Sequence, residues 1–401
     1  MGKVRQTIEE TTKYMWRNQK NRLFMGIMLV LMVVYVLIFA PHFRSEYDMD
    51  MAQLEIEMIG NGVQPDNGKK SGLIVPSIMT QTTAYINQEY EFGTQRELLT
   101  TLRQGDIYRY LDLQMMDGPK EAETDISTMF YSLFGDDLMF FKSWAFRESV
   151  PDLNFHIIHE ITSLQQLHLF LIGTGPLILL SGLIFMISDI HTKDLTLTSQ
   201  KSGVPLNWRS YLFVQSMTAL GFVLAFYTLF FGAFYVLNGV LHGFGGLHYP
   251  ISFPQETVGW FFVRSVPYIV ILFILFSRLN TLISLWTRQS VVSMGSLVFI
   301  VFFSSIYLDG AAADILPFNL GFLPMSYIDF GQVIAGRHAL VPAIRGLTVY
   351  TSGLVVLGLT ILVVEIILYI TSKRITRQKF TAKGGEINEK YNLLDGFTHF
   401  T

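Results

Sequence analysis

One stretch of the sequence partly matches a phosphate-binding loop. Residues 62–71 end in the tetrapeptide Gly-Lys-Lys-Ser, which begins at Gly68. A phosphate-binding loop needs four residues between its first glycine and the Gly-Lys pair, and it follows a strand. Here five residues separate Gly62 from Gly68, and no strand is predicted before them. We therefore do not expect nucleotide binding at this stretch.

A second stretch has the residue types of a metal site. His156, His159 and Glu160 are spaced so that one face of a helix would carry all three, which suits a divalent cation. The zinc-protease pattern needs another histidine where the chain has Ser163, so that class of hydrolase is excluded. With His168 nearby, a metal site remains one reading. The other is a helix that enters the membrane interface with histidines among the headgroups.

Two ionisable residues fall inside apolar stretches, namely Arg264 and Glu365. Charged groups are costly in hydrocarbon and often mark function. Each lies near one end of its stretch, where a long side chain can reach the headgroups. Carboxylates and histidines do not recur through the middle of any stretch, which disfavours an ion-coupled pump. Because the sequence offers neither a catalytic dyad nor a metal signature, we expect no catalytic site and no cofactor in this chain.

Apolar composition sets the class of protein. Half of the 401 residues are apolar and 15% are charged, which is typical of a membrane protein. A helix needs about 20 apolar residues to span a bilayer. Six stretches qualify: residues 23–40, 167–187, 211–237, 258–276, 291–308 and 347–370. The predicted fold class is therefore an all-α membrane protein with six transmembrane helices.

The distribution of charge predicts the orientation. Lysine and arginine gather in residues 3–22, 193–209, 278–288 and 373–383. With six crossings these stretches share one side, which the positive-inside rule assigns to the cytoplasm. Residues 41–160 contain 9 basic and 20 acidic residues, a net of −11, whereas the rest nets 20 minus 12, or +8. We expect both termini in the cytoplasm and a mainly helical extracellular domain over residues 41–166.

The remaining parts of the chain are assigned by pattern. Residues 1–22 alternate basic and apolar positions and predict an amphipathic helix on the cytoplasmic membrane surface. The alternative is a plain charged flank that only sets the topology. Residues 371–401 form a cytoplasmic tail. The chain has no cysteine, which excludes disulfides and thiolate chemistry and favours a bacterial cytoplasmic membrane as its location.

Residues 187–205 carry a family resemblance. They read Ile-Ser-Asp-Ile-His-Thr-Lys-Asp-Leu-Thr-Leu-Thr-Ser-Gln-Lys-Ser-Gly-Val-Pro. This resembles the link between helices two and three in permeases of ABC exporters of the second type. There an acidic residue leaves the membrane, a short amphipathic helix docks on the ATPase subunit, and a proline turn returns to helix three. The resemblance implies a coupling segment over residues 189–206, with these coupling residues: Asp189, Lys193, Asp194, Leu195, Leu197 and Pro205.

The chain departs from the family in one place and matches it by chance in another. Lys193-Asp194-Leu195-Thr196 stands where the family usually has Gly-Thr-Leu-Glu. A closer textual match, residues 89–100, lies in the predicted extracellular domain, where it cannot reach a cytoplasmic ATPase. We interpret that second match as coincidence.

The layout of the whole chain also resembles this family. Residues 315–340 are apolar but interrupted by proline and glycine, like the short re-entrant helices that close the exit outside. Irregular backbone at that depth needs protein or a water-filled cavity around it. The alternative is a surface loop with a buried apolar side. The resemblance implies an extracellular gate that includes Pro317, Pro324 and Tyr327.

The resulting functional hypothesis is the transmembrane subunit of an ATP-driven exporter for a hydrophobic or amphipathic cargo. The resemblance implies a dimer of ATPase subunits, which hold ATP and Mg²⁺, and a second permease subunit, identical or homologous. The bilayer is the other partner, and nucleic acid is not expected. Two rivals remain. One is a membrane-tethered sensor or immunity protein that binds a peptide without transport. The other is a membrane-embedded enzyme, which would need a polar cluster near one membrane face.

Overall fold

The computed structural model describes residues 2–39, 160–193, 206–252, 256–309, 320–335 and 347–375, together with seven isolated residues between 97 and 157. Several predictions lie outside these residues. They are most of the domain at 41–166, the tail from residue 376, and the positions His156, His159, Asp194, Leu195, Leu197, Pro205 and Pro317.

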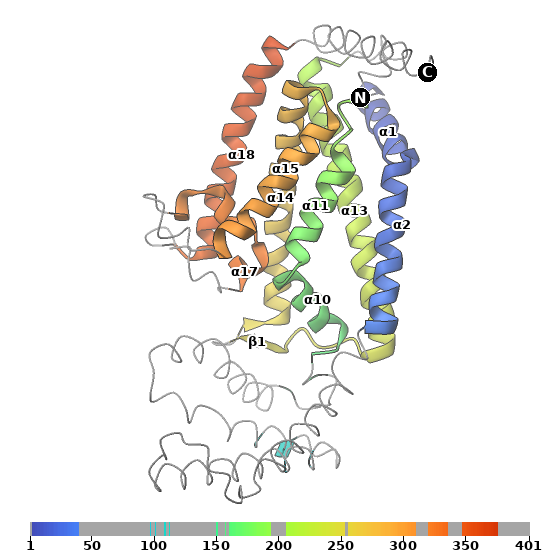
Figure 1. The fold of residues 1–401 in the computed structure, drawn as a ribbon, viewed down its shortest axis with the longest axis vertical. Coiled ribbons are helices and arrows are strands. Elements are labelled where there is room, and N and C mark those ends of the chain that lie inside the picture. Colours follow the sequence, from blue (N-terminus) through green and yellow to red (C-terminus); the bar gives the residue numbers. More distant parts are fainter. Residues whose placement is uncertain are drawn as a thin grey trace, which may run out of the picture. The chain divides into compact units, whose positions relative to one another are not determined.

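The described chain is mostly helical, and its long helices are apolar (Figure 1). Four are long and apolar enough to cross a membrane: α2 (Gln19–Val34, continued by a π-helix Tyr35–Phe39), α13 (Trp208–His242), α14 (Val258–Thr287) and α18 (Val349–Arg374). A bent pair, α10 (Ser163–Ile172) and α11 (Gly175–Ile187), makes a fifth if it counts as one span. Helix α15 (Ser290–Asp309) is also apolar, and its part Ser290–Phe303 is shorter than a membrane span. A mostly helical chain is thus confirmed, with four or five candidate membrane spans among the described residues, and the six predicted spans stay a prediction.

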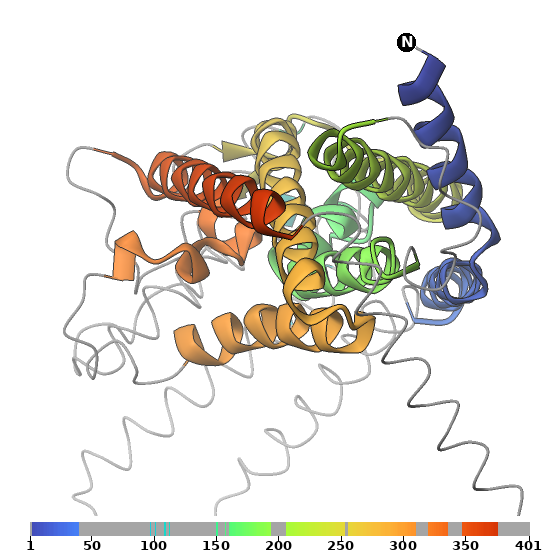
Figure 2. The ribbon, with the colours of Figure 1, turned by 90° about the horizontal axis from the view of Figure 1, so that it is seen from above.

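Contacts divide the chain into two compact units, which are described separately. The first contains residues 1–31, 167–233 and 261–401. Its helices α2, α11, α13, α14 and α18 run side by side, as the two views show (Figures 1 and 2). Gly182 of α11 lets Phe24 of α2 and Tyr227 of α13 approach closely, since a side chain there would overlap both rings. Small residues at such crossings are usual in membrane helices.

Helix α1 (Gly2–Arg17) turns away from the axis of α2 at Asn18 (Figure 2). Asn18 caps α2, because its side-chain oxygen accepts a hydrogen bond from the backbone N–H of Lys20 at 3.1 Å. One face of α1 is buried through Thr7, Thr11 and Met15, which recur every four residues. Val4 and Ile8, which flank this face, and Trp16 stay exposed. The predicted helix is present, and one of its faces packs against protein.

The predicted span 167–187 is not one straight helix. Helices α10 and α11 meet at an angle of 75° across Gly173 and Thr174. Pro176 lies in the first turn of α11, where its missing N–H costs nothing. The bend exposes the backbone carbonyls at the end of α10, which must find partners elsewhere.

Three short helices follow α15 in the first unit: η2 (Leu320–Phe322), η3 (Pro324–Tyr327) and α17 (Phe330–Ile334). Tyr327 and Phe330 are completely buried, and the segment packs on α11, α15 and α18. Asp329 caps α17 by accepting a hydrogen bond from the N–H of Gln332 at 3.3 Å. This segment is folded into the helical unit rather than lying on its surface.

The second unit contains residues 32–166 and 234–260. Its described part includes two short antiparallel strands, β1 (Pro250–Ser252) and β2 (Glu256–Thr257). After α13 the chain turns through Gly243 and Gly245, which have positive φ angles of 95° and 79° and so use a backbone conformation that favours glycine. Asn238 anchors residues 160–162 to α13 by donating to the carbonyl of Ile161 at 3.1 Å.

Candidate functional site

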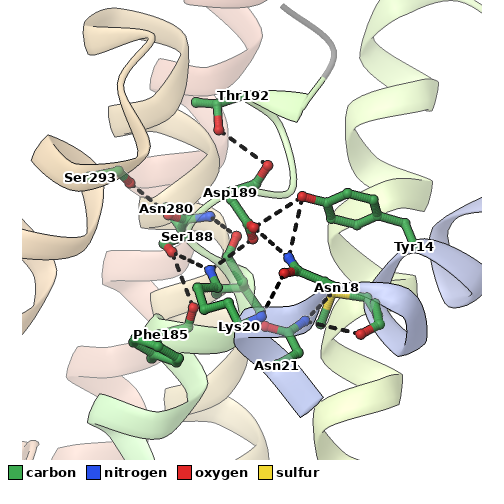
Figure 3. A network of polar contacts seen from close by, with 12 residues as sticks. Tyr14, Asn18, Lys20, Asn21, Phe185, Ser188, Asp189, Thr192, Asn280 and Ser293 are labelled. Carbon is green, nitrogen blue, oxygen red and sulfur yellow. Dashed lines mark hydrogen bonds and ion pairs between the residues drawn. The ribbon is translucent and has the colours of Figure 1, made fainter. Parts of the chain in front are cut away.

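The C-terminal end of α11 is surrounded by polar side chains from other helices (Figure 3). We call residues 187–193, together with the side chains bonded to them, the polar hub. The carboxylate of Asp189 is its centre: it accepts hydrogen bonds from Tyr14 Oη at 3.0 Å and Asn18 Nδ2 at 2.6 Å. Lys20 Nζ forms an ion pair with its other oxygen at 3.0 Å. Three side chains from the α1–α2 corner thus converge on one carboxylate.

Lysine side chains add further contacts at this corner. Lys20 also donates to Ser188 Oγ at 3.0 Å and lies 5.1 Å from the ring centre of Phe185. The ammonium of Lys193, which is buried, lies 4.2 Å from the ring centre of Tyr14. Cations over aromatic rings are attracted by the negative face of the ring. Both lysines therefore stabilise the packing of residues 185–193 against the corner between α1 and α2.

His191 connects the hub to α13 and α14. It is buried, with Nδ1 2.9 Å from Gln215 Oε1 and Nε2 3.0 Å from Thr281 Oγ1. Gln215 in turn donates to the carbonyl of Ile190 at 2.9 Å. These bonds satisfy side chains and backbone that could otherwise not be buried. They also fix His191 between the two longest helices.

Asn280 of α14 completes the hub and extends it to α15. Its Nδ2 donates to the carbonyl of Ile187 at 2.9 Å, and its Oδ1 accepts from Ser293 Oγ at 2.6 Å. The carbonyl of Ile187 is one of the last four of α11, which have no partner within the helix. Side chains of α1, α2, α13 and α14 are thus bonded to residues 187–193, where the predicted coupling segment begins.

A buried ion pair lies next to the hub on α14. Arg278 is bonded through two nitrogens to both carboxylate oxygens of Glu365 on α18, with Nη2 3.0 Å from Oε2. Its third nitrogen donates to Ser216 Oγ of α13 at 2.8 Å. The side chain of Arg278 is 5% exposed and that of Glu365 33%. A two-pronged pair is the strongest geometry for these groups.

At the opposite end of the first unit, the short helices interlock with α14 and α18. Tyr268 Oη donates to the carbonyl of Tyr327 at 3.2 Å, and Tyr327 Oη donates to that of Gly321 at 2.8 Å. Gly353 of α18 lies against both tyrosine rings, so a side chain there would overlap them. The two tyrosines hold η2 and η3 in place.

The bend between α10 and α11 is closed by α17. Gln332 Nε2 donates to the carbonyl of Ile172 at 3.2 Å, which supplies one of the partners that the bend requires. Gly331 lies directly on the carbonyl of Leu171, and no side chain would fit between them. The helix bend and the short helix α17 thus satisfy each other's backbone groups inside the protein.

The predicted site residues that the structure describes lie in separate regions of the first unit. Asp189 and Lys193 belong to the hub, and Tyr327 and Pro324 belong to η3. Arg264 lies 5.6 Å from the ring centre of Tyr350, whose hydroxyl donates to the Arg264 carbonyl at 3.5 Å. Glu365 does not extend alone toward the headgroups as expected, because it is paired with Arg278. Within the described residues no group of three His, Asp or Glu side chains is arranged for a metal.

Sequence reasoning missed most of the hub. We assigned Arg278 to a loop because the apolar stretch ends at Phe276, whereas α14 continues to Thr287. Ser277, Asn280, Thr281 and Ser284 recur at intervals of three or four, which places polar groups on one face of a helix. That periodicity is the signal that would have revealed a helix with a buried polar face.

Comparison with known proteins identifies no relative: no protein-family model, no curated protein and no solved structure matches this chain.

Proposed function

We propose that this chain is the permease subunit of an ATP-driven ABC exporter that moves a hydrophobic or amphipathic cargo, such as a peptide, toxin, drug or lipid-like molecule, out of the cell. The observation that carries the proposal is the polar hub. It binds the start of residues 189–206 to α1, α2, α13 and α14 through named hydrogen bonds and an ion pair. A segment that passes a push on to the membrane helices would need an anchor of this kind.

The hub suggests how work done on the coupling segment would reach the membrane helices. Residues 194–206 would dock on an ATPase subunit, and closure of that subunit on ATP would push them. Because Asp189 and His191 are held by four neighbouring helices, the push would move α11 together with those helices rather than bend the loop alone. Coupling over a distance needs packed networks of this kind.

The short helices at the other end of the unit are the proposed extracellular gate. Helix α11 runs from the bend that Gln332 closes to the hub that Asp189 anchors. A shift of α11 would therefore strain the contacts of α17 at the same time. The second permease subunit would supply the other wall of the path, and the location would be a bacterial cytoplasmic membrane.

The sensor or immunity reading makes a different prediction for the same residues. A tethered binding protein does not need residues 189–206 to bind an ATPase. The test is to purify the tagged full-length chain from its native membranes in mild detergent and to measure vanadate-sensitive ATP hydrolysis in the eluate. The variants are Leu195→Ala/Leu197→Ala and, as a matched leucine pair outside, Leu98→Ala/Leu99→Ala.

The exporter predicts that ATP hydrolysis elutes with the wild-type chain and with Leu98→Ala/Leu99→Ala but is lost with Leu195→Ala/Leu197→Ala. Equal activity in all three would contradict the coupling segment. Loss only with the outer pair would reverse the proposed orientation. Absence of ATP hydrolysis from the wild-type eluate would favour the sensor.

A further inference from the structure

Three cations gather where α13 begins and α18 ends. The guanidinium of Arg209 lies 4.5 Å from the ring centre of Tyr369, and Lys373 Nζ lies 4.4 Å from the same ring. Arg374 follows Lys373 in the last turn of α18, and all three cations are exposed. We call Arg209, Tyr369, Lys373 and Arg374 the cation cluster. One tyrosine ring is thus in contact with a cation of α13 and a cation of α18.

The cation cluster differs from the other cations of this unit in its charge balance. Arg278 is paired with Glu365 and Lys20 with Asp189. Among the described residues, no carboxylate forms an ion pair with a member of the cation cluster. Like charges held close together repel, so their arrangement around Tyr369 favours a ligand that carries negative charge.

The surface beside the cation cluster is apolar. Leu362, Ile366 and Ile370 of α18 are 47–55% exposed, and Tyr369 itself is 40% exposed. Phe213, one turn after Arg209 on α13, is 49% exposed. Tyrosine at the edge of an apolar surface is typical of the membrane–water interface. A ligand here would have its negative group among the cations and its hydrocarbon along the helices.

We propose that the cation cluster is a binding site for the phosphate headgroup of an anionic phospholipid, whose acyl chains lie along α18. Tyr369 positions Arg209 and Lys373, the two cations bind the phosphate, and Arg374 adds to the local positive potential. Basic pockets between membrane helices bind such headgroups in this way. The proposal needs only a membrane location and is independent of transport.

The test measures the thermal stability of the full-length chain in a zwitterionic detergent during titration with dioleoylphosphatidylglycerol. Parallel titrations use dioleoylphosphatidylcholine and inorganic phosphate. The variant is Arg209→Gln/Lys373→Gln, and the matched control is Arg17→Gln/Arg22→Gln, which removes two exposed cations from α1 and α2. Native mass spectrometry of the same samples counts bound lipid, so that a change in the stability of the apo protein cannot hide a change in binding.

We expect the anionic lipid to raise the melting temperature of the wild type and of the control, and phosphatidylcholine to have little effect. Arg209→Gln/Lys373→Gln should weaken the apparent affinity for the anionic lipid about thirtyfold, since each cation near an anionic surface is worth about a fivefold change in affinity. Tyr369→Leu should weaken it severalfold, and Tyr369→Phe should weaken it less, because the ring face is retained.

Two results would overturn the proposal. Equal loss of lipid binding in the cluster variant and in the control would mean that attraction by diffuse charge accounts for it. Stabilisation by inorganic phosphate at the concentrations that suffice for the lipid, without bound lipid in the mass spectrum, would identify the site as one for a soluble anion.

Discussion

Arg278 of α14 and Glu365 of α18 form a two-pronged ion pair whose arginine is almost completely buried. Both residues belong to helices that are mostly apolar. Burying either charge alone is costly, whereas the pair with the added bond to Ser216 satisfies all the groups involved. The pair therefore fixes the register of α14 against α18 and lies within one turn of Asn280 and Thr281 of the hub.

Replacing one residue of the Arg278–Glu365 pair should destabilise the protein more than replacing both residues. We expect Arg278→Met or Glu365→Gln alone to cost about 3 kcal/mol of unfolding free energy, because one buried charge or its hydrogen-bonding group loses its partner. The double variant Arg278→Met/Glu365→Met should cost clearly less than the sum of the two. Thermal unfolding in detergent measures all three, and additive losses would mean that the two residues do not act as a pair.

Substitutions in the Lys20–Asp189 ion pair of the hub should also destabilise the protein, but by less. Lys20 and Asp189 have side chains that are 26% and 21% exposed, so solvent screens part of their interaction. Lys20→Met and Asp189→Asn should each cost about 1–2 kcal/mol. Tyr14→Phe, which removes only one hydrogen bond, should cost about 1 kcal/mol. If Lys20→Met has no effect on the melting temperature, the hub is not an anchor.

Two glycines of α18 give a matched test of the contact between α18 and the short helices. A side chain at Gly353 would overlap Tyr268 and Tyr327, whereas nothing lies within 4 Å of the corresponding position at Gly358. Gly353→Ala should therefore destabilise the protein by about 1–3 kcal/mol through overpacking. Gly358→Ala should be neutral or stabilise it by up to about 1 kcal/mol, since alanine favours a helix. The melting temperatures of the two variants should move in opposite directions or differ clearly.

The topology can be tested directly because the chain has no native cysteine. Single cysteines at Ser71 and Ala312, which lie in the predicted outer stretches, should react with a membrane-impermeant maleimide in intact cells. A cysteine at Ser202 should react only after permeabilisation. Labelling at Ala312 decides whether residues 291–308 cross the membrane, which the length of α15 alone leaves undecided. Labelling of Ser202→Cys in intact cells would contradict the orientation.

The long helices could be predicted from the sequence, and their ends could not. A run of apolar residues identifies α13, but α13 extends beyond the predicted 211–237 on both sides. Helix α14 likewise continues to Thr287, past the apolar stretch that we took as its limit. An apolar run marks the part of a helix that can contact lipid. The run ends where the helix buries polar groups against its neighbours, although the helix itself continues. The positions of Arg278 and Asn280 therefore depend on tertiary contacts that composition does not contain.

Two residues of the candidate site, Asp189 and Lys193, were predicted from the sequence, and the others were not. Asp189 was chosen by resemblance, but its partners Tyr14 and Asn18 come from more than 170 positions away in the chain. The bend before α11 had a local signal in Gly173, Gly175 and Pro176, which a search for uninterrupted apolar runs ignores. Glu365 could be recognised as unusual, but its partner could not be identified without the packing of α14 against α18.

The most direct test of the central claim is photo-crosslinking from the coupling segment. A p-benzoylphenylalanine residue is placed at position 197 of the full-length chain, with position 98 as the control, and native membranes are irradiated with and without ATP. Crosslinked partners are identified by mass spectrometry. We predict that position 197 captures a protein with a nucleotide-binding loop and that position 98 does not. Capture of such a protein from position 98, or only of proteins without such a loop from position 197, would contradict the account.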